Sequence, residues 1–280
     1  MKQREENVNI KEKNRVFLLF ILYNPLGFML QYNAKISVLG GEKGMINRFL
    51  EIIEDSSRIV FFGGAGVSTE SGIPDFRGEG GLYGLVPEQM ISHSYFVSHP
   101  DRFYEFYRTK MIYPEASSNN AHKALAYLEE KGKILSVITQ NIDGLHQQAG
   151  SKTVRELHGS VHRNYCMRCG KFYGVTHILN SDTVPVCECG GTVKPDVVLY
   201  EEPLDSSILN AAIRDISECD TLIVGGTSLA VYPAAGLINY FCGKYLVLIN
   251  KSPTPADRMA DLVIRENIGE VMGEILQEKK

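Results

Sequence analysis

Short apolar runs alternate with amphipathic stretches along most of the chain. Six runs have the length and apolar character of buried strands: residues 58–62, 134–139, 154–157, 221–224, 245–249 and 262–264. Stretches between and beyond them have the spacing of helices: residues 45–55, 100–113, 120–131 and 206–218, a segment from Pro233, and the C-terminal residues. Strands that alternate with helices predict an α/β fold whose parallel sheet is covered on both faces.

Two stretches interrupt this alternation, residues 82–118 and 159–195. We predict that they form a smaller domain inserted into the sheet domain. The sheet domain would then consist of residues 45–81, 119–158 and 196–280.

The first 44 residues differ from the rest. Val16–Leu22 is apolar, but Asn24 and Pro25 interrupt the apolar stretch before it reaches the roughly 20 residues of a membrane-spanning helix. We favour Met45 as the true start of the protein, since Gly41–Gly44 can be encoded almost wholly in purines, as in a ribosome-binding site. A peripheral extension and a signal peptide are the alternatives, in that order.

Composition excludes several classes of protein. Hydrophobic residues make up 44% of the chain and charged residues 22%, which is ordinary for a globular protein. The formal net charge is −4, so no overall positive charge attracts the chain to nucleic acid, and we expect no nucleic-acid partner. Six cysteines are too few for a disulfide scaffold in 280 residues.

A glycine-rich loop follows the first predicted strand. Gly64-Ala65-Gly66-Val67-Ser68 stands where a doubly wound sheet binds a nucleotide, because glycines let the backbone approach phosphates. The dinucleotide fingerprint G-x-G-x-x-G is incomplete, since Thr69 occupies its third glycine position. A tight turn without a ligand is an equally good interpretation of this loop alone.

Other polar segments also follow predicted strands or the glycine loop. They are Gly72–Gly78, with Asp75, Phe76 and Arg77; Thr139–His146; Gly226-Thr227-Ser228; and Asn250-Lys251. Each could be only a turn with local hydrogen bonds. The carboxyl ends of parallel strands share one edge of a sheet, so together these segments predict a single binding site there.

His158 is the histidine best suited to catalysis. It follows the predicted strand 154–157 and precedes Gly159, and an imidazole of ordinary pKa suits general-base work. We interpret five other histidines as surface or hydrogen-bonded groups: His93, His99, His122, His162 and His177.

Four cysteines form two close pairs, Cys166/Cys169 and Cys187/Cys189. Two such pairs separated by seventeen residues resemble the spacing of a zinc ribbon, so they predict one structural zinc ion held by four thiolates. A redox role for Cys166-x-x-Cys169 is the weaker alternative. We expect the isolated Cys219 and Cys242 to be buried apolar thiols.

Taken together, these segments resemble the sirtuins, the NAD-dependent protein lysine deacylases, with their motifs in family order. The matching stretches are GAGVSTESGIPDFRG (64–78), TQNIDGLH (139–146), ELHGS (156–160), the four cysteines, KPDVVLYEE (194–202), GTSLAVYPAAGL (226–237) and LIN (248–250). The resemblance runs from about residue 45 to the C-terminus, and residues 1–44 have no counterpart in it.

The resemblance implies a Rossmann-like NAD-binding domain, a small helical and zinc-binding domain, and a cleft between them. One set of residues would bind the phosphates and nicotinamide: Gly64, Ala65, Ser68, Thr69, Asp75, Phe76 and Arg77. A second set would bind the nicotinamide ribose and carboxamide: Gln140, Asn141, Ile142 and Asp143. A third would bind the adenosine half: Gly226, Thr227, Ser228, Asn250, Lys251 and Ile268.

The resemblance also implies a reaction. The acyl-lysine carbonyl oxygen would attack the ribose carbon as nicotinamide leaves, and His158 would then act as general base, with Asn141 as a second catalytic residue. Val197 and Val198 would lie along an extended acetyl-lysine peptide. The same NAD site could instead serve a protein mono-ADP-ribosyltransferase or a non-enzymatic NAD sensor. We expect a cytoplasmic protein without a stable membrane span.

Two departures from the family pattern concern the acyl group. Tyr200-Glu201-Glu202 replaces the common Phe-Gly-Glu, so we expect an acyl-lysine channel of different shape. Members that remove acidic acyl groups carry Tyr-x-x-Arg, whereas this chain has Tyr104 and Tyr107, with Arg108 one residue further on. We therefore predict a preference for acetyl or other uncharged acyl groups.

Overall fold

The computed structural model describes residues 41–75 and 88–277, and the chain divides into two compact units, residues 1–48 and 49–280. Helix α3 (Glu42–Asp55) includes the predicted helix 45–55 and begins three residues before Met45. Our expectations for residues 1–40 and for Phe76 and Arg77 lie outside the described residues.

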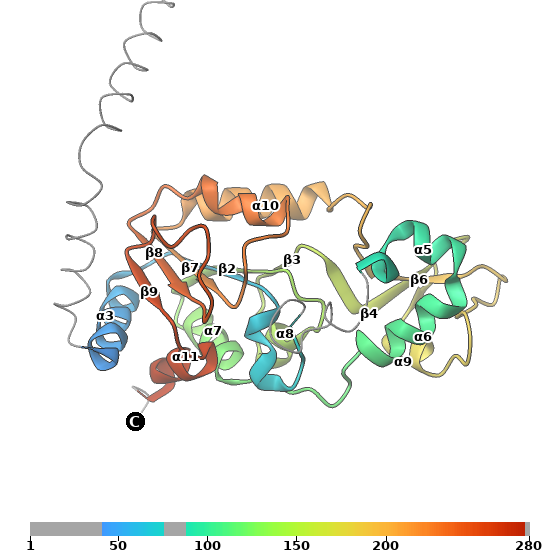
Figure 1. Ribbon diagram of the computed structural model, residues 1–280, viewed down its shortest axis with the longest axis horizontal. Coiled ribbons are helices and arrows are strands. Elements are labelled where there is room, and N and C mark those ends of the chain that lie inside the picture. Colours follow the sequence, from blue (N-terminus) through green and yellow to red (C-terminus); the bar gives the residue numbers. More distant parts are fainter. Residues whose placement is uncertain (1–40, 76–87, 278–280) are drawn as a thin grey trace, which may run out of the picture. The chain divides into compact units, whose positions relative to one another are not determined.

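A six-stranded parallel sheet forms the centre of the second unit (Figure 1), as the alternation of strands and helices predicts. Its strand order is β3-β2-β1-β7-β8-β9. The strands are β1 (Ile59–Gly63), β2 (Ile134–Thr139), β3 (Val154–Glu156), β7 (Thr221–Gly225), β8 (Tyr245–Ile249) and β9 (Leu262–Ile264). Every residue of β1 and β7 is buried, which explains their continuous apolar sequences.

Helices cover both faces of this sheet. Helix α10 (Ser206–Glu218) packs Ala212 and Ile216 into one core cluster with Val60 and Phe62 of β1. Helices α7 (Asn120–Glu130) and α11 (Ile268–Gln277) lie on the opposite side of the sheet from α10 (Figure 1). The chain therefore has the predicted α/β architecture, and three predicted helices end within three residues of their expected limits: α6, α7 and α10.

A three-stranded antiparallel sheet with order β5-β4-β6 forms a second core. Its strands are β4 (Gly159–Cys166), β5 (Phe172–Tyr173) and β6 (Val193–Val197). Short helices pack beside it: α5 (His93–Ser98), α6 (Pro100–Lys110) and α9 (Val175–Leu179). Aromatic rings of α5 and α6 fill this core, with the ring of Phe96 edge-on to that of Phe103 at 5.0 Å.

Arg163 on β4 joins the two sheets. Its Nη1 lies 2.6 Å from Glu156 Oε2 on β3, and its Nε lies 2.7 Å from Asp196 Oδ2 on β6. Glu156 is almost fully buried, so the pairing also neutralises a charge inside the protein. This arrangement supports a small inserted domain. Its boundaries, residues 82–118 and 159–195, stay a prediction.

Some elements differ from the sequence-based predictions. The segment after Pro233 is a 3₁₀ helix, η4 (Ala234–Tyr240), and short 3₁₀ turns occupy Ala65–Val67 (η1), Thr69–Ser71 (η2) and Glu88–Ile91 (η3). Helix α8 (Leu145–Ala149) follows Gly144 directly and has too few residues for a periodic signal. Cys219 is buried as predicted, but the prediction for Cys242 is wrong, because it lies exposed in the loop after η4.

Within residues 41–75 and 88–277, no helix combines the length and the apolar character needed to cross a bilayer.

Candidate active site

Four strands of the large sheet end side by side. Gly63 at the end of β1 pairs with Thr139 of β2 and with Gly225 of β7, and Gly225 pairs with Ile249 of β8. The segments that follow these strands therefore begin at one edge of the sheet. The predicted convergence is confirmed for the segments directly after these four strands, while residues 76–78 of the segment Gly72–Gly78 lie outside the described residues.

Two glycine loops meet back to back at this edge. Gly66 N–H donates to the carbonyl of Gly226 over 2.8 Å. A Cβ on Gly66 would lie 2.8 Å from Gly226 Cα, and a Cβ on Gly226, whose φ is +58°, would lie 2.4 Å from Val67 N. Both positions need glycine because the two backbones touch.

A partly buried polar network joins the first glycine loop to the segment after β2. The Ser68 hydroxyl donates to Asp143 Oδ2 over 2.7 Å, and Asn141 Nδ2 donates to Ser68 Oγ over 3.0 Å. Asp143 also accepts from the N–H of Leu145. Burial raises the pKa of Asp143, and these hydrogen bonds oppose that rise. The network fixes the Asn141 and Asp143 side chains relative to the loop.

Gln140 connects the same segment to the second glycine loop. Its Nε2 donates to Thr227 Oγ1 over 3.1 Å, and Thr227 Oγ1 in turn accepts from the N–H of Leu229. The loops after β1, β2 and β7 are thus held together by side chains as well as by the sheet.

His158 is half-buried between the two sheets, just after β3 and directly before β4. Its Nδ1 lies 2.9 Å from the carbonyl oxygen of Gln140. Since a carbonyl can only accept, Nδ1 carries the proton, and Nε2 of the neutral ring is left as a proton acceptor. Burial lowers the pKa of His158, so the ring is neutral near pH 7.

Gly159 lets β4 and β6 approach closely beside this histidine. Its φ is +79°, and a Cβ there would lie 1.9 Å from the Asp196 carbonyl oxygen. Gly159 pairs with Val197, and Val198 N–H donates to the His158 carbonyl over 3.0 Å. The backbone around Val197 and Val198 is therefore tied directly to that of His158.

A single cavity of about 700 Å³ unites these segments, a size suited to a small molecule or cofactor. The predicted cofactor, catalytic and peptide residues that the structure describes all line it. They are Gly64, Ala65, Ser68, Thr69, Asp75, Gln140, Asn141, Ile142, Asp143, His158, Val197, Val198, Gly226, Thr227, Ser228, Asn250, Lys251 and Ile268.

Glu70 is a further cavity residue that the sequence analysis missed. Its Oε2 accepts from Gly269 N–H over 2.6 Å, at the first turn of α11. A Cβ on Gly269 would lie 2.7 Å from this carboxylate, so the contact depends on glycine. The carboxylate fixes the start of α11, where Ile268 enters the cavity lining. Its position between the glycine loop and the polar segment Gly72–Gly78 was the available signal.

The acyl-specificity positions differ in their surroundings. The Tyr104 hydroxyl donates to the Val193 carbonyl over 2.6 Å, whereas Tyr107 is buried and lines the cavity. Arg108 donates through Nη1 to the Thr183 carbonyl over 2.8 Å and is not among the cavity-lining residues. The second position is therefore a buried, neutral phenol at the cavity wall. Lys110, one turn further along α6, is a cation that also lines the cavity.

The four predicted metal ligands come together at one end of the small sheet. The sulfur atoms of Cys166, Cys169, Cys187 and Cys189 all lie within 4.8 Å of one another. Tetrahedral zinc with Zn–S bonds of about 2.3 Å requires sulfurs about 3.8 Å apart. The Cys166–Cys189 and Cys169–Cys187 separations are 3.5 and 3.6 Å. Four converging thiols at these distances fit one zinc ion.

Two buried histidines lie beside the site without taking part in it. The rings of His122 on α7 and His146 on α8 are 4.7 Å apart, and their side chains are 0% and 1% exposed. Within the described part of the chain, His122 Nε2 and both ring nitrogens of His146 have no hydrogen-bond partner. The hydrogen-bonded interpretation of His122 holds only for Nδ1, which contacts Asn119.

Comparison with known proteins agrees with this geometry. The sequence model of the Sir2 family matches residues 64–233. A protein of Clostridium perfringens named NAD-dependent protein deacetylase is 62% identical over 239 residues, covering 82% of this chain and 98% of the relative. One of Clostridium acetobutylicum with the same name is 59% identical, with the same coverage.

Solved structures give the same result. One is a Sir2 variant with a deacetylated p53 peptide and 3′-O-acetyl ADP-ribose. It is 42% identical, has a TM-score of 0.78, and is matched over 83% of this chain and 98% of its own. A Sir2 structure with a p53 peptide and NAD is 41% identical, with a TM-score of 0.75 and coverage of 84% and 98%. This chain belongs to the Sir2 family.

Proposed function

We propose that this protein is an NAD-dependent protein-lysine deacetylase, which forms free lysine, nicotinamide and O-acetyl-ADP-ribose. The names of its relatives and the ligands of the solved Sir2 structures support the proposal. One observation carries it. His158 leaves Nε2 available as a base in a cavity that both glycine loops and the Val197–Val198 backbone also line.

NAD, when bound, supplies the ribose that receives the acetyl group and releases nicotinamide. The loops after β1 would hold its phosphates and nicotinamide, the segment Gln140–Asp143 its nicotinamide ribose and carboxamide, and the loops after β7 and β8 its adenosine half. Hydrogen bonds join Ser68, which follows β1, to Asn141 and Asp143, which follow β2. This network orients the Asn141 amide before any ligand arrives, which lowers the cost of ordering on binding.

His158 accepts a proton at Nε2 and then carries a charge in a half-buried position. The carbonyl of Gln140 at Nδ1 stabilises the charged ring, since that nitrogen donates in both protonation states. The lowered pKa keeps the base unprotonated at neutral pH, when it must accept the proton.

The peptide would add as a strand beside Val197 and Val198. We propose acetylated lysines in proteins or peptides as substrates. Uncharged acyl groups should be preferred, because the second position of the Tyr-x-x-Arg pattern is the neutral Tyr107 rather than an arginine. In a matched pair of peptides, acetyl should be removed faster than succinyl. Equal or faster removal of succinyl would contradict this preference.

The zinc ion would be structural. Four cysteine ligands would complete the tetrahedral coordination of the ion and leave no open position for a reacting group. This is typical of structural rather than catalytic zinc. Four cysteines that must stay reduced to bind zinc favour a reducing compartment, so we propose that the protein acts in the cytoplasm. Cell fractionation with antibodies would test this location.

The experiment that tests the function uses a p53-derived peptide with one acetyl-lysine, incubated with the protein with and without NAD. Mass spectrometry should show acetyl loss only with NAD, together with acetyl-ADP-ribose. His158→Asn should lower turnover by about 10²–10⁴-fold. The control is His99→Asn, which changes an exposed histidine that does not line the cavity and should leave turnover as in wild type.

Other outcomes would replace the proposal. ADP-ribose attached to a protein, without loss of acetyl, would indicate a mono-ADP-ribosyltransferase. Bound NAD with no chemical change in peptide or cofactor would indicate an NAD-sensing binding protein.

A further inference from the structure

The last residue of β6 and the five residues after it form a segment that borders the cavity, Val197–Glu202, which we call the substrate segment. Its first part is tied to the catalytic histidine through the Val198 N–H and the His158 carbonyl. Its last part lies against the start of α5. Tyr200 N–H donates to the Ile91 carbonyl, and His93 N–H donates to the Tyr200 carbonyl, each over 3.0 Å. The segment is thus held at both ends.

A strained residue stands in the turn at its far end. Glu202 N–H donates to the Leu199 carbonyl over 3.0 Å, which closes a four-residue turn. Glu201, the third residue of this turn, has a φ of +77°. Type II turns require a positive φ at this position and therefore favour glycine there, since a Cβ is crowded in that conformation.

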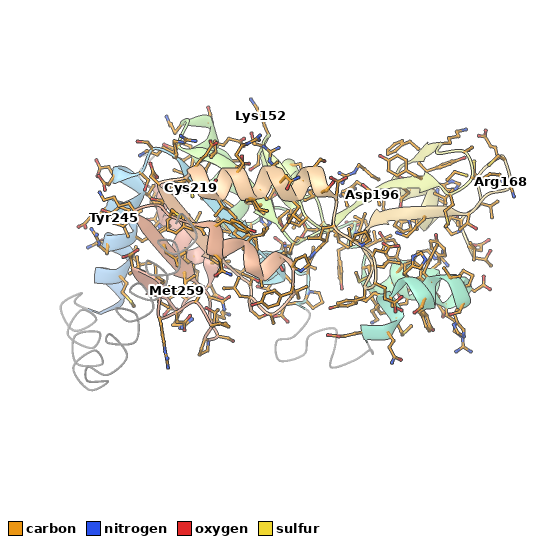
Figure 2. The ribbon with its side chains drawn as sticks, turned by 90° about the horizontal axis from the view of Figure 1, so that it is seen from above. Lys152, Arg168, Asp196, Cys219, Tyr245 and Met259 are labelled. Atoms are coloured by element: carbon orange, nitrogen blue, oxygen red, sulfur yellow. The ribbon has the colours of Figure 1, made fainter. Side chains whose placement is uncertain are left out.

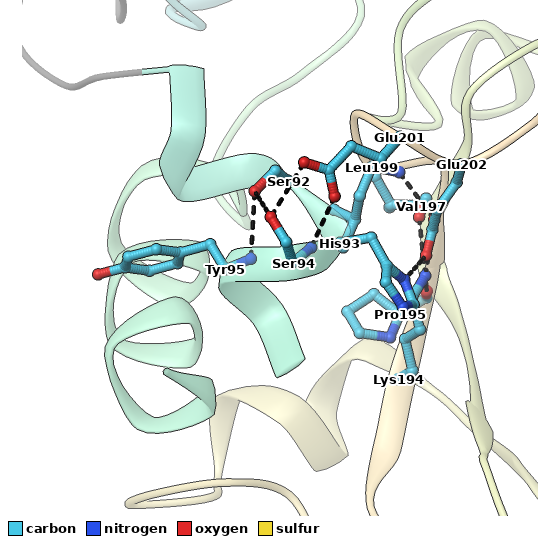
Figure 3. A network of polar contacts seen from close by, with 10 residues as sticks. All are labelled: Ser92, His93, Ser94, Tyr95, Lys194, Pro195, Val197, Leu199, Glu201 and Glu202. Carbon is cyan, nitrogen blue, oxygen red and sulfur yellow. Dashed lines mark hydrogen bonds and ion pairs between the residues drawn. The ribbon is translucent and has the colours of Figure 1, made fainter. Parts of the chain in front are cut away.

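The Glu201 side chain makes two contacts to one residue, Ser94, on α5 (Figure 3). Oε2 accepts from the Ser94 N–H over 2.8 Å, and Oε1 accepts from the Ser94 hydroxyl over 2.9 Å. The Ser94 N–H belongs to the first turn of α5, where backbone donors have no partner within the helix. A two-point contact to a carboxylate is stronger and more directional than a neutral hydrogen bond.

Glu202 secures the same turn from its other side. Its Oε2 accepts from the Leu199 N–H over 2.9 Å and from Lys194 Nζ over 3.1 Å, and its Oε1 lies 2.8 Å from His93 Nδ1. The contact to Leu199 lies within the turn, and the contact to Lys194 joins the turn to β6. Both Glu201 contacts, by contrast, cross to α5 (Figure 3).

We propose that Glu201 is a positioning residue for the peptide substrate. Through Ser94 it fixes the far end of the substrate segment, so that the backbone at Val197 and Val198 is already extended when an acyl-lysine peptide arrives. A strained conformation persists only where surrounding contacts stabilise it. Glycine would adopt this turn without strain but would remove both side-chain contacts to Ser94. Only the backbone contacts of Tyr200 and the Glu202–His93 contact would then hold the segment against α5. The inference rests on the proposed deacetylase function.

The test compares steady-state kinetics of wild type and Glu201→Gly with the acetylated p53 peptide. The variant removes the carboxylate and relieves the backbone strain at once. We expect the KM for the peptide to rise by about 3–10-fold, as for the loss of one typical hydrogen bond. The kcat at saturating peptide and the KM for NAD should stay as in wild type. Glu201→Gln, which keeps one acceptor, should restore part of the peptide KM.

A double-mutant cycle tests whether Ser94 is the partner. Ser94→Ala should raise the peptide KM less than Glu201→Gly, since the backbone N–H contact survives. Combining the two should add nothing to Glu201→Gly alone. Additive effects would show that Glu201 acts through another group.

Asp205 provides a matched control. Its carboxylate also accepts from the first turn of a helix, α10, with Ser207 N–H at 2.8 Å and Ile208 N–H at 3.0 Å, and it is not among the cavity-lining residues. Asp205→Ala should lower the free energy of unfolding without raising the peptide KM. A rise like that of Glu201→Gly would show that the effect is general loosening.

Hydrogen exchange separates this inference from the proposed function. In Glu201→Gly without peptide, the amides of residues 198–202 should exchange faster than in wild type. A wild-type protein without deacetylase activity would overturn the proposed function, while the exchange result would still decide whether Glu201 orders the segment. An unchanged peptide KM, or unchanged exchange in the segment, would overturn the positioning role.

Discussion

The buried pair His122 and His146 makes the stability of this protein sensitive to mild acid. Burial lowers the pKa of His122 to about 4. Burial, and then the nearby His122, lower the pKa of His146 well below its ordinary value. Both rings are therefore neutral in the folded protein near pH 7, and protonating either would place a charge in the core.

The sign of the effect follows from the lowered pKa values. Above about pH 6.5 neither folded nor unfolded protein binds protons at these histidines, so stability is unaffected. Below it the unfolded chain takes up protons and the fold does not. Each histidine then lowers the free energy of unfolding by about 1.4 kcal/mol per pH unit. Between pH 6.5 and 5.0 this is about 2 kcal/mol each, a large part of a typical total of about 5–15 kcal/mol.

The perturbation is His146→Leu, and the assay is urea unfolding followed by circular dichroism at pH 8.0 and pH 5.0. The change in packing is the same at both pH values, so it cancels within each protein. The variant should lose about 2 kcal/mol less than wild type on acidification. His99→Gln, at an exposed position, should keep the wild-type pH dependence.

Equal losses in wild type and His146→Leu would refute this reasoning. It would mean that His146 gains a partner or water when protonated, because the other titrating groups are common to both proteins and cancel in the comparison. The urea m-values must agree between the proteins, since a changed m-value would reflect a change in the denatured state.

Three further predictions concern the small sheet. Cys187→Ser should abolish stoichiometric zinc, measured by atomic emission, and make residues 159–195 sensitive to protease; full zinc content would contradict the four-thiolate site. Gly159→Ala should destabilise the protein by about 3 kcal/mol or more in urea unfolding, because its Cβ would overlap a backbone oxygen of β6. A loss below about 0.5 kcal/mol would contradict that overlap. Arg163→Met should cost about 2 kcal/mol by leaving a buried carboxylate poorly paired, whereas Lys171→Met, in an exposed ion pair, should cost clearly less. Equal costs for these two would show that the link between the sheets contributes little.

The large sheet could be predicted because its strands are buried on both faces. Continuous apolar runs such as Ile134–Thr139 then contrast sharply with the amphipathic helices around them. The convergence of the site followed from one rule, that parallel strands end at a common edge. The metal site could be predicted equally well, because its ligands come in two close pairs along the sequence.

The small sheet could not be predicted in the same way. Asn164 is fully buried in β4 and donates to the carbonyls of Val161 and Tyr173, and the pairing of β4 with β6 shifts register between Ser160 and Asn164. A buried polar side chain and an irregular register both disturb the alternation that marks a strand. No signal in the sequence shows that Glu201 has a positive φ or that His146 is buried, since both depend on distant contacts.

Strand β4 connects the two chemical centres of the protein. It begins at Gly159, next to the proposed base, and ends at Cys166, a proposed zinc ligand. Seven residue steps at about 3.3 Å span at most about 23 Å. Figure 2 shows Arg168, just beyond this strand, at the outer tip of the small sheet, far from Asp196 beside Gly159.

At that separation the metal would act on catalysis mechanically rather than chemically. Zinc would anchor one end of a rigid strand whose other end sets the backbone at His158. Partial loss of zinc would then lower the fraction of active molecules, while those that retain the ion would keep wild-type kinetic constants. Zinc supply would control how much enzyme works rather than how fast each molecule turns over.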